Sequence, residues 1–121
     1  MLPNLYNIQT ASGSQYSASF TIKNDDGSLA NITNKTFEFV VRDRTTIPNT
    51  TVFSVNSTSS TGNGTITVNT TTSVVSVTLT PAAVNLITTG GGPYTLWMDP
   101  NLSDATALVV GTFFVESVAA P

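Results

Sequence analysis

The segment of this 121-residue chain whose side chains best suit metal chemistry is Asp99-Pro100-Asn101-Leu102-Ser103-Asp104. It places oxygen-bearing side chains at alternate positions, as calcium-binding loops do. A complete EF-hand loop starting at Asp99 would need glycine at its sixth position and glutamate at its twelfth, and the chain has Asp104 and Val110 there. We therefore treat Asp99, Asn101 and Asp104 as weak candidate calcium ligands in a segment that a turn between two strands explains more simply.

The side chains that most often carry catalysis are missing or badly placed. The chain has no histidine and no cysteine, which removes the commonest general base, the serine–histidine pair and any thiolate site. Asp25 and Asp26 are adjacent, so their side chains point to opposite faces of an extended segment. Two carboxylates that cleave a glycosidic bond must instead face each other across the bond at a separation of about 5–10 Å. Together with Gly27, Asp25 and Asp26 predict a turn. The glycines at 90–92 lack the Lys-Ser/Thr that follows in a phosphate-binding loop. We expect no enzymatic activity and no cofactor.

The sequence predicts a polar surface with very little charge. Only 9% of the residues are charged, against about 25% in an ordinary soluble domain, and the net charge is −3. Nucleic-acid binding depends on a clustered basic face that neutralises phosphates. Here the four basic residues, Lys23, Lys35, Arg42 and Arg44, are scattered among carboxylates. We therefore expect neither nucleic acid nor an anionic membrane as a partner.

Alternation of apolar and polar residues with a period of two, interrupted by turn residues roughly every 8–12 positions, dominates the chain. Proline at position 81 suits the first position of a short helical segment over 81–88. The pattern predicts one all-β domain over residues 1–121, an antiparallel sandwich of Greek-key type with about eight strands, with a barrel as the alternative. The expected strands cover 5–9, 15–23, 36–42, 52–55, 66–68, 75–79, 94–98 and 107–118.

The last expected strand, residues 107–118, has apolar residues on both faces, whereas a strand with one solvated face alternates cleanly. Trp97 likewise lies on the face opposite Tyr94 and Leu96. Two explanations stay open: the helical segment covers the outer side of this strand, or these residues contact a neighbouring subunit, since aromatic side chains commonly anchor interfaces. The candidate interface residues are Trp97, Val109, Val110, Phe113, Phe114 and Val115.

Several stretches carry a resemblance to a known family. They are Phe20-Thr21-Ile22-Lys23-Asn24-Asp25-Asp26-Gly27-Ser28 with the following Phe37–Asp43, Val77-Thr78-Leu79-Thr80, Gly92–Asp99 and Gly111–Val115. With them the chain resembles the small immunoglobulin-like domains of tailed-bacteriophage structural proteins, particularly the N-terminal domain of baseplate upper proteins. The resemblance covers most of the chain through strand patterns and a few turn residues. It implies an immunoglobulin-like sandwich without catalytic residues that contacts other virion proteins, in multiple symmetric copies.

Three hypotheses about function follow. The first is a structural component of a phage tail, baseplate or fibre-attachment region, made and assembled in the bacterial host cytoplasm, since neither a signal peptide nor an apolar run of membrane-spanning length is evident. The second is a capsid decoration protein, because the baseplate domain is followed by further modules and this chain stops at Pro121. The third is a carbohydrate-binding or adhesin-type module that uses Trp97 with Asp99 and Asn101.

Overall fold

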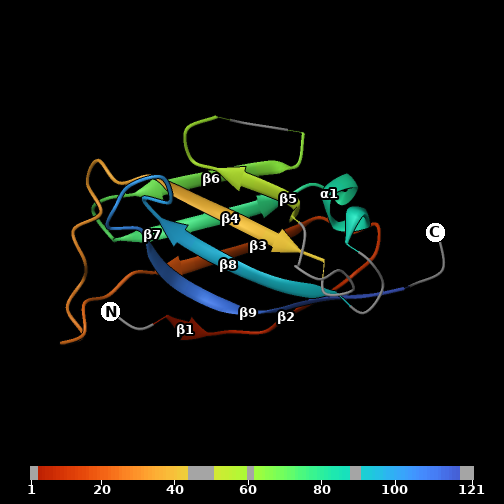
Figure 1. Cartoon of the computed structure of the whole chain (residues 1–121), viewed down its shortest axis with the longest axis horizontal. Helices are drawn as coiled ribbons and strands as arrows, with labels where there is room; N and C mark the ends of the chain where they lie inside the picture. The colour runs from red at the N-terminus through yellow and green to blue at the C-terminus, as the bar shows by residue number, and fades with distance from the viewer. Residues whose placement is uncertain (1–2, 44–50, 60–61, 88–90, 118–121) are drawn as a thin grey trace.

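The computed structural model describes residues 3–43, 51–59, 62–87 and 91–117, which form nine strands and one short helix (Figure 1). Sheet A has the order β1-β9-β8-β4-β5, with β2 also paired to β9, and sheet B has the order β3-β7-β6. The predicted all-β sandwich is confirmed. The strands are β1 (Asn4–Leu5), β2 (Ile8–Ala11), β3 (Tyr16–Thr21), β4 (Phe37–Arg42), β5 (Thr51–Asn56), β6 (Gly64–Asn69), β7 (Val74–Leu79), β8 (Gly92–Met98) and β9 (Thr106–Glu116).

The strand order is that of an immunoglobulin-like Greek key. Sheet B corresponds to strands B, E and D of that fold, and β9-β8-β4-β5 corresponds to G, F, C and C′. The predicted antiparallel pairing is wrong at one place, because β1 and β2 run parallel to β9. The first two strands therefore run alongside the last strand in the same direction, and the chain then crosses to sheet B as β3. One further strand is found because the expected strand at 5–9 is divided in two. Thr88 and Val118, the predicted ends of the helix and last strand, and Gly90 lie outside the described residues.

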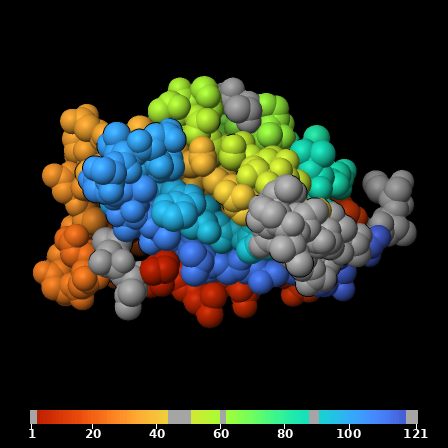
Figure 2. Space-filling model, viewed as in Figure 1, coloured from red at the N-terminus to blue at the C-terminus, as the bar shows by residue number. Residues whose placement is uncertain are grey.

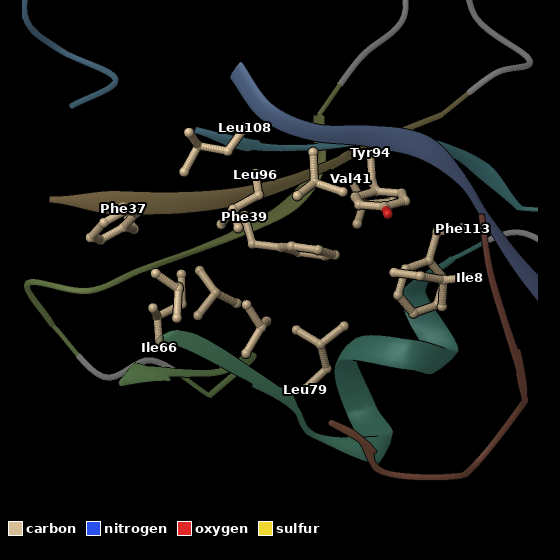
Figure 3. Close-up of a cluster of buried hydrophobic side chains, with 14 of the residues drawn as sticks. Ile8, Phe37, Phe39, Val41, Ile66, Leu79, Tyr94, Leu96, Leu108 and Phe113 are labelled. Atoms are coloured by element: carbon tan, nitrogen blue, oxygen red, sulfur yellow. The ribbon is translucent and has the colours of Figure 1, made fainter. Parts of the chain in front are cut away.

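The two sheets enclose a core built from the inward side chains of their strands, except for β1, whose two residues are exposed (Figure 3). Alternation directs the apolar set of each strand inward, and on β7 the three inward residues Val75, Val77 and Leu79 are completely buried. The ring of Phe39 stacks on Tyr94 with centroids 5.1 Å apart, and Phe113 meets both rings edge to face. The chain has no cysteine, so this apolar packing and the strand hydrogen bonds hold the fold without disulfides.

The helix α1 (Pro81–Leu86) closes one end of the sandwich beside β5 (Figure 1). Proline occupies its first turn as predicted, and the Thr80 hydroxyl caps the helix by accepting a hydrogen bond from the Ala83 N–H at 3.2 Å. Ala83 and Val84 are fully buried among the core residues. The helix therefore does not cover the outer side of β9, and that sequence-based explanation of the apolar last strand is wrong. Because α1 follows β7 directly and is six residues long, its apolar side reaches only the end of the core.

Tyr94 and Gly111 hold the N-terminal segment against sheet A. The Tyr94 hydroxyl donates a hydrogen bond to the backbone carbonyl of Tyr6, whose N–H donates to the Val110 carbonyl at 2.9 Å. Burial, followed by the neighbouring tyrosines, raises the pKa of Tyr94, so its hydroxyl stays a neutral donor. At Gly111 a Cβ atom would overlap the Tyr6 carbonyl. The parallel strands thus approach β9 so closely that this position requires glycine.

We predict that Gly111→Ala lowers the free energy of unfolding by about 1–3 kcal/mol, because the Tyr6 backbone must move to admit the methyl group. Chemical denaturation of the purified chain measures this change. Gly62→Ala is the matched control, since a Cβ there would meet open space. Equal stabilities for the two variants would show that the N-terminal segment is not held against β9.

Candidate functional site: the outer face of sheet A

The outer face of sheet A consists of the side chains that point away from the core on β4, β5, β8 and β9. The register sets them side by side, with Val40 opposite Thr95 and Thr95 opposite Val110. Residues of β8 and β9 make up much of the near surface in Figure 2. The charged side chains on this face are Glu38 and Arg42 on β4 and Glu116 at the end of β9. The other members include Val40, Ser54, Pro93, Thr95, Trp97, Ala107, Val110, Thr112 and Phe114, and all of these are neutral.

Trp97 lies half-buried at one end of this face, opposite Glu38 on β4 and Ala107 on β9. An open depression of about 340 Å³ adjoins it. The floor is apolar, because Val40 is only 8% exposed although it points outward. The remaining lining is mostly polar, with Arg42, Ser54 and Asn101 among its residues, although Pro100 and Ala105 also contribute to it. A flat aromatic ring beside hydrogen-bonding groups suits either a protein side chain or a sugar ring.

Phe114 marks the other end of the same face. It pairs with Gln9 of β2 and keeps 38% of its surface exposed. It lies seven residues beyond Ala107 along β9, which is about 20 Å at the rise of a strand. The stretch between the two aromatic residues is uncharged, consisting of Pro93, Thr95, Val110 and Thr112.

The structure divides the six predicted interface residues into two groups. Trp97, Val110 and Phe114 point outward on the outer face of sheet A and keep accessible surface. The other three are at most 4% exposed and belong to the core, so their burial removes them from the candidate interface: Val109, Phe113 and Val115. The apolar run on β9 therefore has two sources: some of its residues face the core, and others, such as Val110 and Phe114, face outward.

Glu38, Val40 and Arg42 were not anticipated as neighbours of Trp97. Their place depends on the pairing of β4 with β8, strands separated by about 50 residues of sequence. No local sequence signal predicts that register, because it is set by the burial of the inward-facing apolar side chains on each strand.

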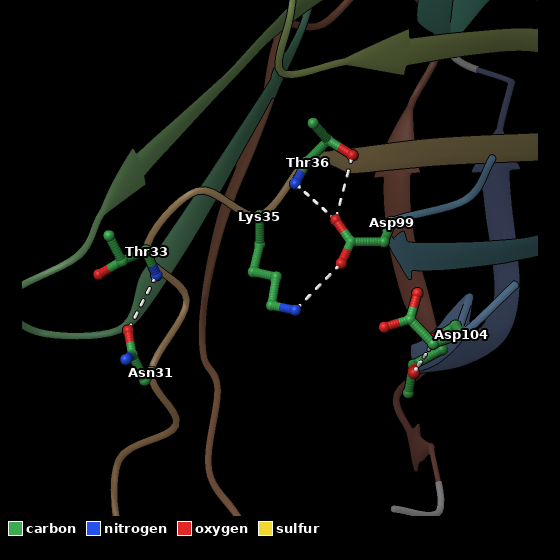
Figure 4. A network of polar contacts seen from close by, with 7 residues as sticks. Asn31, Thr33, Lys35, Thr36, Asp99 and Asp104 are labelled. Carbon is green, nitrogen blue, oxygen red and sulfur yellow. Dashed lines mark hydrogen bonds and ion pairs between the residues drawn. The ribbon is translucent and has the colours of Figure 1, made fainter. Parts of the chain in front are cut away.

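Asp99 directly follows β8 and is buried, with 3% of its surface exposed (Figure 4). One carboxylate oxygen accepts hydrogen bonds from the Thr36 N–H at 2.9 Å and the Thr36 hydroxyl at 3.3 Å. The other oxygen pairs with the Lys35 ammonium at 3.3 Å, and the Asp99 N–H donates to the Thr36 carbonyl at 2.7 Å. The residue adopts a left-handed φ of 51°, which aspartate tolerates better than most residues. These contacts fasten the turn after β8 to the segment that precedes β4.

The calcium hypothesis gains no support from this arrangement. The hydrogen bond from the Thr36 backbone, helped by Lys35 and opposed by desolvation, holds the pKa of Asp99 below its usual value. Both oxygens of its carboxylate are engaged within the chain, while Asn101 and Asp104 are exposed in the turn between β8 and β9. Over the described part of the chain, no three acidic, histidine or cysteine side chains gather as a metal ion would require. Asp99 is buried and does not line the depression beside Trp97. Of the predicted sugar-binding cluster of Trp97, Asp99 and Asn101, only Trp97 and Asn101 line it.

We predict that Asp99→Ala lowers the free energy of unfolding by about 2 kcal/mol, because the Thr36 N–H and hydroxyl lose their acceptor. Asp99→Asn keeps one acceptor oxygen and should cost less. Denaturant titration of both variants at neutral pH tests the order, and a loss of less than 0.5 kcal/mol in Asp99→Ala, roughly the level of an ordinary surface substitution, would contradict it.

The same carboxylate predicts a dependence on pH. Since its folded pKa lies below the unfolded value of about 3.9, it contributes stability above that pH and loses the contribution as pH falls through the folded pKa. The stability gap between the wild-type chain and Asp99→Asn should therefore be full at pH 7 and shrink below about pH 4. A gap that stays constant down to pH 2 would show that Asp99 does not titrate with folding.

No known protein family matches this chain, and a comparison with curated proteins finds no relative. Within the described residues, no helix combines the length and the apolar character needed to span a membrane. The resemblance to phage structural domains thus remains a prediction.

Proposed function

We propose that this chain is a non-enzymatic structural domain that docks into a larger assembly through the outer face of sheet A. The observation that carries the proposal is the uncharged surface between Trp97 and Phe114, with an outward aromatic residue at each end. Interface cores are depleted in charge and enriched in aromatic side chains. The central strands β8 and β4 lie beneath this face and give it a rigid support.

The physical gain from docking lies mainly in the two rings. An aromatic side chain that becomes fully covered buries up to about 150–250 Å², and each Å² of apolar surface removed from water contributes about 25 cal/mol. Trp97 is half-buried and Phe114 is 38% exposed in the free chain, so each has only part of this gain left to make. A stable complex therefore needs the whole strip between them, including Val110 and Pro93.

The assembly that fits best is a bacteriophage virion, in its tail, baseplate or fibre-attachment region. Support comes from the resemblance of the strand sequences to phage domains and from the immunoglobulin-like strand order. A capsid decoration protein is an equally structural alternative that would use the same face. In either case the partners are other virion proteins, present in several symmetric copies.

A carbohydrate-binding module is the second candidate, and the depression beside Trp97 favours it. There Arg42, Ser54 and Asn101 surround an aromatic ring with polar groups. The two candidates differ in what they require of Asn101, which lies on the rim of the depression and away from the strip that leads to Phe114.

We predict that Trp97→Ala lowers the number of copies incorporated into assembled particles by about tenfold or more, the effect of losing a central aromatic anchor. Quantitative mass spectrometry of purified particles measures the copy number, and circular dichroism checks that the isolated variant is folded. Leu86→Ala is the control, because Leu86 is a large apolar residue that is more exposed, at 54%, but lies on α1. Normal incorporation of Trp97→Ala would contradict docking through this face.

Asn101→Ala separates the two functions. Under the docking proposal it should leave particle incorporation nearly unchanged. Under the carbohydrate alternative it should abolish binding on a glycan array together with Trp97→Ala. Glycan binding by the wild-type chain that both variants lose would replace docking as the function of this face.

A further inference from the structure

The inward row of β3 is less well covered than the rest of the core. Tyr16, Ala18 and Phe20 point between the sheets, yet each remains partly accessible, whereas the inward residues of the neighbouring β7 are completely buried. Tyr16 and Phe20 do make edge-to-face contacts, with Phe113 and Tyr6 respectively. The sandwich is therefore packed but not closed along β3.

The backbone of β3 also has an unused side. In sheet B the strand stands at one end of the order, and the described residues include no strand on its other side. The Ile22 N–H, just after β3, donates to the Ser73 carbonyl on the β7 side at 2.8 Å. Because backbone groups alternate sides along a strand, the N–H and C=O groups of Ser17, Ser19 and Thr21 point away from β7. They form a free edge of six residues, about 20 Å long.

The free edge forms one wall of an open cleft of about 890 Å³. The opposite wall comes from sheet A, through Leu5 and Tyr6 of the N-terminal segment and Leu108 of β9. Leu5 and Tyr6 are the exposed members, at 76% and 51%. The cleft thus combines a row of unpaired amides with apolar side chains, the two features that strand addition uses for affinity and for specificity.

The shape and charge of the cleft restrict its occupant. Its lining contains two charged residues, Lys23 and Asp25, which have opposite signs and lie together beyond the end of β3, so the rest of the lining favours an uncharged segment. In a second folded copy the same edge is flanked by that copy's own Leu5 and Tyr6, so a single extended segment fits this cleft with fewer side chains in the way than a second copy does. A single extended segment can enter. Ala18, small and flanked by Tyr16 and Phe20, leaves room for a larger side chain from that segment.

We infer that the β3 edge is a strand-addition site that takes one extended, uncharged segment of a partner polypeptide with apolar residues at alternate positions. The segment pairs with the amides of Ser17, Ser19 and Thr21 and places its apolar side chains in the cleft against Leu5, Tyr6 and Leu108. This site is separate from the outer face of sheet A and does not depend on the function proposed for that face.

The test uses the isotope-labelled full chain and a panel of capped hexapeptides in which threonine alternates with valine, leucine, isoleucine or phenylalanine. We expect at least one peptide to slow hydrogen exchange of the Ser17, Ser19 and Thr21 amides by about tenfold, since an added strand supplies their missing acceptors. Ser19→Pro removes one edge N–H and should weaken binding about tenfold, whereas proline on the free side of an edge strand leaves the β7 ladder intact. Ser19→Ala is the matched control: it loses the same hydroxyl bond to Ser76 but keeps the N–H, and should bind normally.

A second variant, Ala18→Arg, keeps every edge amide but places a charged side chain in the cleft, so it should also abolish binding. It keeps the inference testable if Ser19→Pro fails to fold. Trp97→Ala should leave peptide binding unchanged, which separates this site from the docking face. The inference is overturned if no peptide protects the three amides at millimolar concentration, or if protection appears on β6 instead. It is equally overturned if the chain forms a dimer that Ser19→Pro dissociates, since a second copy would then be the occupant.

Discussion

The N-terminal segment can pair with only one sheet, and its pairing with β9 determines the form of the rest of the molecule. In the immunoglobulin arrangement the first strand can extend the sheet that contains strand B, which is β3 here. In this chain both β1 and β2 run beside β9 instead. That choice requires a hydrogen bond from the buried Tyr94 hydroxyl and a position without a side chain at Gly111. It covers the edge of sheet A and leaves the edge of sheet B open.

The two outer faces of the sandwich differ in a way that follows from their side chains. On sheet B most outward residues are serine and threonine, although Val74 and Asn69 also face out. Two pairs hydrogen-bond across the strands: Ser17 with Thr78 at 3.0 Å and Ser19 with Ser76 at 2.8 Å. Such a face gains little from being covered, because its polar groups already have partners and would lose water. The outer face of sheet A instead carries Trp97 and Phe114, with an uncharged strip between them. The difference in polarity between the two outer faces therefore favours contact through sheet A.

The sequence predicts the sandwich well because the alternation of apolar residues is itself the signal. Val75, Val77 and Leu79 all face the core, and Pro81 begins the helix where turn chemistry placed it. The parallel pairing at the N-terminus was missed because Leu5 and Tyr6 are as compatible with one sheet as with the other, and the deciding contacts come from Tyr94 and Gly111, about 90 and 105 residues away. The candidate site was predicted only in part for the same reason. A row of apolar residues on β9 does not reveal which members face inward once a register shift intervenes near Trp97.

The scarcity of charge limits how this chain can bind. Electrostatic complementarity mainly accelerates encounter and makes it sensitive to salt, and a chain with 9% charged residues has little of it. Binding must then rely on apolar contact and backbone hydrogen bonds, which hold a complex together but do not guide its formation. Such interactions gain most where several act at once, because the first contact raises the effective concentration for the second. The two proposed surfaces, the outer face of sheet A and the free edge of β3, belong to different sheets. If both proposals hold, one chain contacts two neighbours together. A symmetric assembly, in which each neighbour is already held in place, is the setting where a domain with so little charge binds best.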